Sequence, residues 1–138
     1  MRSICTIMLA LFIQTGFSQS FNLTLRIENI QEIKGTLHIG IFSNSDDFPK
    51  EGKEYKTLKL KVKKKFESIL ISNLPNGEYA IAIFHDVNSD GKCNTNILGI
   101  PKEPYGFSNN IKPRLFKPSF KDCKVILSSD KTIVIKLI

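Results

Sequence analysis

Hydrophobic and polar residues alternate in short segments along most of the chain. Between Phe21 and Ile27, apolar side chains occupy every second position and polar side chains lie between them. A period of two places the apolar side chains on one side of an extended segment, which predicts a half-buried strand. Turn signals such as Pro75-Asn76-Gly77 separate these segments. The seven segments with this pattern are 21–27, 37–41, 58–62, 69–71, 79–83, 125–127 and 133–137.

The seven segments predict an all-β domain. No window carries the spacing of an amphipathic helix. An antiparallel two-sheet sandwich, prealbumin-like or immunoglobulin-like, buries one face of each strand. Two connections are longer than usual, 43–54 and 86–119, and the second holds four of the six prolines together with several large apolar residues. We therefore expect this second connection to be ordered and to fold back over the sandwich.

The length and composition of the chain exclude several classes of protein. The 138 residues are 41% hydrophobic and 24% charged, with no Trp and three Cys. Such a composition excludes a disordered chain, a collagen-like repeat and a disulfide-dense scaffold. Removing residues 1–18 of the 138 leaves 120, close to the commonest domain size. We therefore expect a single domain over residues 19–138.

The N-terminus has the three parts of a secretory signal peptide. Arg2 supplies the charge, an apolar run extends from Ile4 to Ile13, and small residues precede a cut after Ser18. Cleavage there would leave Gln19 as the mature N-terminus, and a cut after Ser20 is the alternative. The apolar run is shorter than the ~20 residues of a spanning helix. The sequence thus predicts an exported protein, periplasmic or extracellular, with no transmembrane segment in the mature chain.

The chain is basic, with a formal net charge of +7. An exported protein seldom meets nucleic acid, so we do not expect a nucleic-acid partner. Eight of the 17 lysines fall between Lys50 and Lys65, whereas the mature chain keeps only two arginines, Arg26 and Arg114. Because specific phosphate recognition prefers the guanidinium group, this bias favours a solvated strand face. A diffuse attraction to an anionic polysaccharide or surface is the alternative.

The strongest local signal for an ion site follows the strand that ends near His85. Oxygen-bearing side chains stand at the first, third and fifth places of the next segment and Gly91 at the sixth, the spacing of a loop that wraps a hard cation. Ile97 stands at the twelfth place instead of a carboxylate, so we expect a structural calcium ion bound weakly, at about 10⁻⁴ to 10⁻³ M. A polar turn without an ion is the alternative. The candidate ligands are Asp86, Asn88, Asp90, Asn94, Asn96 and the carbonyl of Lys92.

Two cysteines, Cys93 and Cys123, remain after cleavage removes the signal peptide together with Cys5. Such a pair is often bridged in an oxidising compartment, which makes a disulfide our prediction and two buried free thiols the alternative. His38 and His85 are further ligand types, but the spacing of the four residues matches no usual zinc or copper site. We therefore expect no transition-metal centre.

Catalytic chemistry finds little support in the sequence. His85 beside Asp86 has the residue types to orient a base, yet no Ser or Cys stands in a nucleophile context and a phosphate-binding glycine loop is absent. We do not expect an enzyme, and an uncharacterised hydrolase is the least favoured alternative.

The stretch 99–110 combines aromatic and amide side chains. Tyr105 and Phe107 have the character of a platform for a sugar ring or peptide, with Asn109 and Asn110 as hydrogen-bonding groups. The alternative is that these aromatics pin the long connection to the core. A glycan or the envelope surface is the partner class that the first interpretation implies.

Several motifs resemble known families. The run LPNGEYAIAIFHD (74–86) resembles the turn and strand of prealbumin-like (transthyretin-like) sandwiches. The segments HDVNSDGKCNTN, LGIPKEPYGFSNN and PSFKD are similar to the bacterial secreted family called domain of unknown function 2141, and the resemblance covers nearly the whole mature chain. It implies a small exported β-sandwich with no established activity and no catalytic residues to transfer.

The chain departs from this family's pattern at three positions. Cys93 and Asn94 follow Asp-Gly-Lys where the family has an apolar residue and then Asp, and Cys123 stands where a small residue is common. These differences weaken the expected ion and favour the disulfide. The sequence as a whole predicts an exported, non-catalytic binding or structural module. The alternative is a carbohydrate or anionic cell-surface binder that uses Tyr105, Phe107 and the lysine-rich strand.

Overall fold

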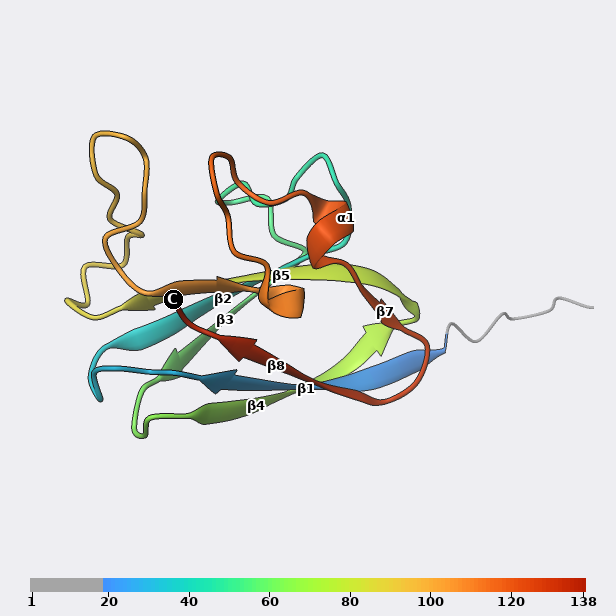
Figure 1. Cartoon of the computed structure of the whole chain (residues 1–138). Helices are drawn as coiled ribbons and strands as arrows, with labels where there is room; N and C mark the ends of the chain where they lie inside the picture. Colours follow the sequence, from blue (N-terminus) through green and yellow to red (C-terminus); the bar gives the residue numbers. More distant parts are fainter. Residues whose placement is uncertain (1–18) are drawn as a thin grey trace, which may run out of the picture.

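A computed structural model describes residues 19–138 as two β-sheets packed face to face (Figure 1). The predicted signal peptide lies outside these residues. The all-β sandwich is confirmed, and the seven alternating segments all form strands. An eighth strand, β6, lies inside the long connection. The elements are β1 (Ser20–Glu28), β2 (Thr36–Phe42), β3 (Lys56–Lys61), β4 (Glu67–Pro75), β5 (Gly77–Asp86), β6 (Tyr105–Phe107), the 3-10 turn η1 (Ser108–Asn110), α1 (Phe120–Cys123), β7 (Val125–Leu127) and β8 (Lys131–Lys136).

The smaller sheet has the order β4-β1-β8 and the larger sheet the order β3-β2-β5-β6, with β7 also paired to β5. The prediction of antiparallel sheets holds for every pair except β1 and β8, which run parallel from Leu23↔Lys131 to Glu28↔Lys136. Parallel neighbours require a long crossover. The chain between β1 and β8 includes the whole larger sheet, which supplies that crossover.

The core lies between the two sheets. Leu25 of β1 and Ile39 of β2 are completely buried there, as alternation in both strands predicts. In β3, Leu58 and Leu60 pack against this core while Lys59 and Lys61 are exposed. The lysine-rich segment is therefore a solvated face on an edge strand, where charge also hinders pairing with a second sheet.

Strand β6 closes one edge of the sandwich against the C-terminal end of the chain. The Tyr105 N–H donates to the Ile138 carbonyl at 3.1 Å, and the Ile138 N–H donates to the Tyr105 carbonyl at 2.8 Å. Gly106 permits this approach, since a Cβ atom there would lie 2.8 Å from Cγ2 of Ile135. The missing side chain thus lets the two sheets meet along this edge.

A second apolar cluster covers part of the outer face of the larger sheet. Phe48, from the connection between β2 and β3, packs edge-on against Phe42 with ring centroids 5.2 Å apart, and against Phe107 and Phe120 at 6.1 Å. Cys123 of α1 belongs to the same cluster. The loops 43–55, 87–104 and 111–119 rise on this side of the molecule (Figure 1). We call this outer face, together with the three loops, the loop face.

Candidate functional site

Asp86, the last residue of β5, organises the loop that follows it. Its carboxylate is almost completely buried and accepts hydrogen bonds from the N–H groups of Asp90 at 3.1 Å and Gly91 at 2.9 Å. The turn contains two left-handed residues, Ser89 with φ 61° and Gly91 with φ 77°. A single carboxylate thus closes the turn by satisfying two N–H groups that point inward.

Asp86 also pairs with His38 of the neighbouring strand β2. The distance from Nε2 of His38 to the carboxylate is 3.4 Å, and the side chains are only 12% and 3% exposed. The imidazole stacks on the ring of Phe84, with centroids 4.5 Å apart. Because His38 lies opposite Phe84 and Thr36 opposite Asp86, His38 and Asp86 are diagonal neighbours on one face. Sequence reasoning missed this pair, although alternation in both strands placed the two residues on the outer face.

His85 lies on the other side of β5 from Asp86, because successive residues of a strand point to opposite faces. It is completely buried, and its Nε2 donates a 2.7 Å hydrogen bond to the Lys34 carbonyl. The two adjacent side chains therefore do not form the orienting pair that a hydrolase would need. His85 instead ties the end of β5 to the turn before β2.

Glu103 anchors the start of the same loop. The side chain is buried, and its Oε1 accepts the Val87 N–H at 3.0 Å. Its other oxygen has no partner among the described residues. This contact joins residues 16 positions apart in the sequence.

The side chains of the predicted calcium loop bond mainly to one another. The carboxylate of Asp90 accepts the Lys92 N–H at 2.9 Å and the side-chain amides of Asn88 at 3.0 Å and Asn94 at 2.7 Å. The hydrogen bond from Asn94 is the main cause that lowers the pKa of Asp90. The loop therefore stabilises the ionised form of Asp90 with its own donors.

Asn96 stands apart from this set. Its Oδ1 accepts the N–H groups of Leu98 at 2.9 Å and Ile100 at 3.0 Å, so it holds the tip of the loop. Within residues 19–138, no group of three or more His, Cys, Asp or Glu side chains is placed to hold a metal ion. Calcium at this loop stays a prediction.

The predicted disulfide is absent, because Cys93 and Cys123 are both free thiols. Cys123 is completely buried beside Phe42 and Ala80, and burial raises the pKa of its thiol to about 12. Cys93 lies half-buried in the loop after β5, where burial also raises the pKa of its thiol. The two thiols thus belong to different surroundings, and neither is an activated nucleophile.

Tyr105 and Phe107 belong to β6 rather than to a projecting loop. Phe107 packs in the second apolar cluster, and the two rings contact each other edge-on at 5.9 Å. Both side chains are half-buried. The interpretation that these aromatics pin the long connection to the core is therefore the one that the structure favours.

Asn109 and Asn110 use their side chains to hold the backbone. The amide of Asn109 donates to the carbonyls of Asp122 and Lys124, both at 3.0 Å. The amide of Asn110 bonds to two backbone groups of β8, at 2.7 and 3.1 Å. Both residues have positive φ, which Asn tolerates better than most residues. Both amides thus hold the backbone of the long connection, and a ligand-binding role for them stays a prediction.

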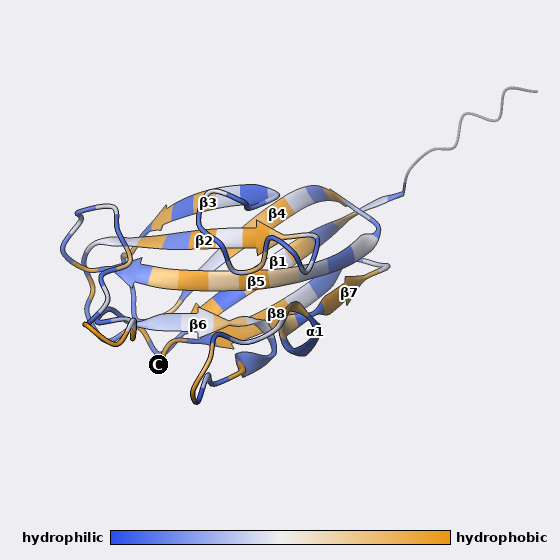
Figure 2. Ribbon diagram, turned by 90° about the horizontal axis from the view of Figure 1, so that it is seen from above, coloured by the Kyte–Doolittle hydropathy of each residue, from blue (hydrophilic) through white to orange (hydrophobic). Residues whose placement is uncertain are grey.

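The long connection departs from our prediction at two tips, which do not fold back on the sandwich. Ile97 and Leu98 are 104% and 82% exposed, and Leu115 and Phe116 are 88% and 84% exposed. Figure 2 shows hydrophobic colour in the loop after β5 and in the loop before α1. We call residues 96–100 the first tip and residues 113–118 the second tip. Gly99 lies in the first tip, and Pro113 and Pro118 lie at the two ends of the second tip.

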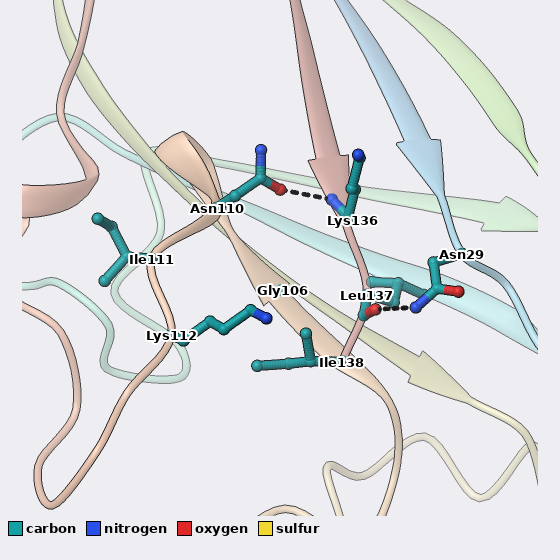
Figure 3. Close-up of a pocket in the computed structure, with 8 residues that line it drawn as sticks. All are labelled: Asn29, Gly106, Asn110, Ile111, Lys112, Lys136, Leu137 and Ile138. Atoms are coloured by element: carbon teal, nitrogen blue, oxygen red, sulfur yellow. Dashed lines mark hydrogen bonds between the residues drawn. The ribbon is translucent and has the colours of Figure 1, made fainter.

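A small cavity lies where β6 meets the C-terminal end of the chain (Figure 3). Its volume is about 160 Å³, and Gly106, Lys112 and Ile138 are among the residues that line it. Ligand pockets usually have volumes of about 300 to 1,000 Å³. This cavity is therefore smaller than a usual ligand pocket.

Comparison with models of known protein families shows which family the chain belongs to. Residues 25–135 match DUF2141, a family of uncharacterised proteins conserved in bacteria, over more than half of the sequence. The chain belongs to this family. No curated protein and no solved structure matches it. In the part of this DUF2141 member that the structure describes, no helix is long and apolar enough to cross a membrane.

Proposed function

We propose that this DUF2141 member is an exported, non-catalytic binding module that contacts its partner through the loop face. One observation carries the proposal. The four most exposed large apolar side chains among residues 19–138 all lie on the two tips, with Leu70 next at 59%. Exposed apolar groups that gather in one region mark interaction sites.

Asp86, His85 and Cys123 have side chains of types that enzymes use in catalysis. Each of them is engaged in the fold here, which supports a non-catalytic role. Asp86 closes a turn, and His85 bonds to a backbone carbonyl. The thiol of Cys123 is buried, and its pKa is raised to about 12. A nucleophile with a base at hydrogen-bond distance is therefore not part of this proposal.

Export is part of the same proposal and rests on the signal-peptide pattern of the first 18 residues. Gln19, the residue after the predicted cut, is bonded to the fold, since the Asn76 N–H donates to its carbonyl at 2.8 Å. We also keep the prealbumin-like class as part of the proposal, on the turn-and-strand run from Leu74 to Asp86.

Sedimentation with washed bacterial envelopes tests the proposal. The chain from residue 19 to 138 is mixed with envelopes that keep their lipids, proteins and polysaccharides. We expect it to sediment with them, and the variant Leu115→Ser/Phe116→Ser to lose most of this binding. The matched control Phe66→Ser/Leu70→Ser removes exposed apolar groups away from the loop face. Equal binding by both double variants, or none by the wild type, would refute the proposal.

Calcium at the loop after β5 is a second proposal, with a stabilising role. It is supported by Asp86 and Asp90, which place two carboxylates on one short loop, each accepting backbone N–H groups of that loop. The ion would displace the amide donors of Asn88 and Asn94 and bind their oxygens instead. Its test is thermal unfolding, described in the Discussion.

A further inference from the structure

We infer that the two tips seat the protein on the surface of an anionic phospholipid bilayer. The inference rests on the proposed function and names the partner of the loop face. It combines three properties of the tips: exposed apolar side chains, a preformed backbone, and basic residues on the tip segments themselves.

The first tip is a closed turn that holds its apolar side chains away from the sheet. A bridge between Thr95 and Pro101 forms its base, and the Lys102 N–H donates to the Asn94 carbonyl at 2.7 Å. The Asn96 N–H donates to the Ile100 carbonyl at 2.8 Å and so closes the turn. A turn fixed in this way loses little conformational freedom when Ile97 and Leu98 leave water.

The second tip is held at both of its ends. Asn110 bonds to β8 on one side, and Ser119 caps α1 on the other by accepting the Asp122 N–H at 3.2 Å. Pro113 and Pro118 stand at the ends of the tip and restrict its backbone. Leu115 and Phe116 therefore remain exposed on a defined loop, and burial in the acyl boundary of a bilayer removes them from water.

Both tip segments are basic. The segment 91–102 carries two lysines, and the segment 111–121 carries three lysines and one arginine. Neither segment contains Asp or Glu. Basic side chains next to inserted apolar groups bind anionic headgroups, while their alkyl stems lie along the apolar layer.

The arrangement fits a bilayer better than a protein surface. Stable protein interfaces usually bury a continuous area of about 1,200 Å² or more. Here the apolar groups are divided between two separate loops that project from the same side of the larger sheet (Figure 1). Separate tips enter a fluid surface independently, whereas a protein partner would need a matching pocket for each.

Vesicle flotation tests the inference with the chain from residue 19 to 138. The probes are vesicles of phosphatidylcholine alone and vesicles with about one third phosphatidylglycerol. We expect the wild type to float with the anionic vesicles and to be released by high salt. The variants Leu115→Ser/Phe116→Ser and Ile97→Ser/Leu98→Ser should each lose about tenfold or more in affinity.

Two further variants separate the apolar from the charged contribution. Lys112→Gln/Arg114→Gln/Lys117→Gln should weaken binding to anionic vesicles and remove most of its dependence on salt. The control Phe66→Ser/Leu70→Ser should bind like the wild type. Unchanged melting temperatures would show that the tip variants keep the fold, because all four tip side chains are exposed.

The outcomes distinguish this inference from the proposed function. Envelope binding that depends on the tips, without binding to protein-free vesicles, would overturn the lipid inference and leave the binding module, with an envelope protein or polysaccharide as its partner. Vesicle binding that the tip variants do not change would also overturn the inference. Absence of binding to both envelopes and vesicles would overturn both proposals.

Discussion

Nε2 of His38 lies 3.4 Å from the carboxylate of Asp86, and this contact joins β2 to β5 where the loop after β5 begins. The same carboxylate accepts two N–H groups of that loop, so one buried acid connects the sheet with the first projecting loop of the loop face. Asp86 thus links the position of this loop to the sheet.

The first prediction concerns this acid. Asp86→Ala should lower the free energy of unfolding by about 2 kcal/mol, because the turn loses the acceptor of two N–H groups. Urea denaturation measures the change. Asp46→Ala is the matched control, since Asp46 is exposed and its side chain makes no hydrogen bond in the structure. Equal stability of the Asp86 variant and the wild type would contradict the role of the carboxylate.

The second prediction concerns the close approach of β6 to β8. Gly106→Ala should destabilise the fold by about 1 to 3 kcal/mol, because the new Cβ would lie 2.8 Å from Cγ2 of Ile135 and 3.1 Å from the Lys136 carbonyl. Gly77→Ala is the control, because its Cβ would meet only ordinary contacts at 3.7 Å or more. Chemical denaturation of the two variants should place the larger loss at Gly106.

The third prediction concerns the two thiols. At pH 8, iodoacetamide should modify Cys93 slowly and Cys123 only after unfolding, because Cys123 is completely buried and its thiol keeps its proton. The single variants Cys93→Ser and Cys123→Ser assign the modified site by mass spectrometry. Rapid modification of native Cys123 would contradict its burial, and a chain that stays unmodified even when unfolded would show the two cysteines bridged.

The same thiol predicts a pH dependence at alkaline pH. The pKa of Cys123 rises from 9.0 to about 12 on folding, so the folded state favours the protonated thiol. Its contribution to stability is complete below pH 9.0 and is lost as the pH rises toward about 12. Denaturation of the wild type and Cys123→Ala over this range should show the steeper loss in the wild type. Parallel curves would contradict the shift.

The fourth prediction concerns the mature N-terminus. The full chain produced in a bacterium should be exported and should begin at Gln19, which leaves the Gln19 carbonyl available to the Asn76 N–H and Ser20 paired with Pro75. The intact mass of the exported protein measures the cut. A chain that begins at Phe21 would lack both contacts, and an uncleaved chain would contradict the signal peptide.

The fifth prediction concerns calcium. At about 10 mM calcium, well above the expected dissociation constant, the melting temperature should rise by about 5 °C, because the ion binds the folded loop. Asp90→Ala should abolish the rise, and magnesium at the same concentration should give a smaller one. An unchanged melting temperature would remove calcium from this protein.

The sequence by itself determined the sandwich. Alternation in segments such as 21–27 and 58–62 fixes which side chains are buried, because a strand repeats every two residues and only one face meets the core. The same local chemistry predicted a polar turn after Asp86, where Asn, Asp and Gly tolerate the backbone that the turn needs.

Only the tertiary structure decided which groups meet across the chain. The pairing of His38 with Asp86 depends on the register of β2 against β5, and the strand β6 is too short to show a period. The bonds of Asn109 and Asn110 to distant backbone groups, and the exposure of Leu115 and Phe116, depend on where the long connection touches the sheets. Local sequence patterns predict how a segment folds. Contacts between distant segments form only when the sheets assemble, so these patterns do not predict them.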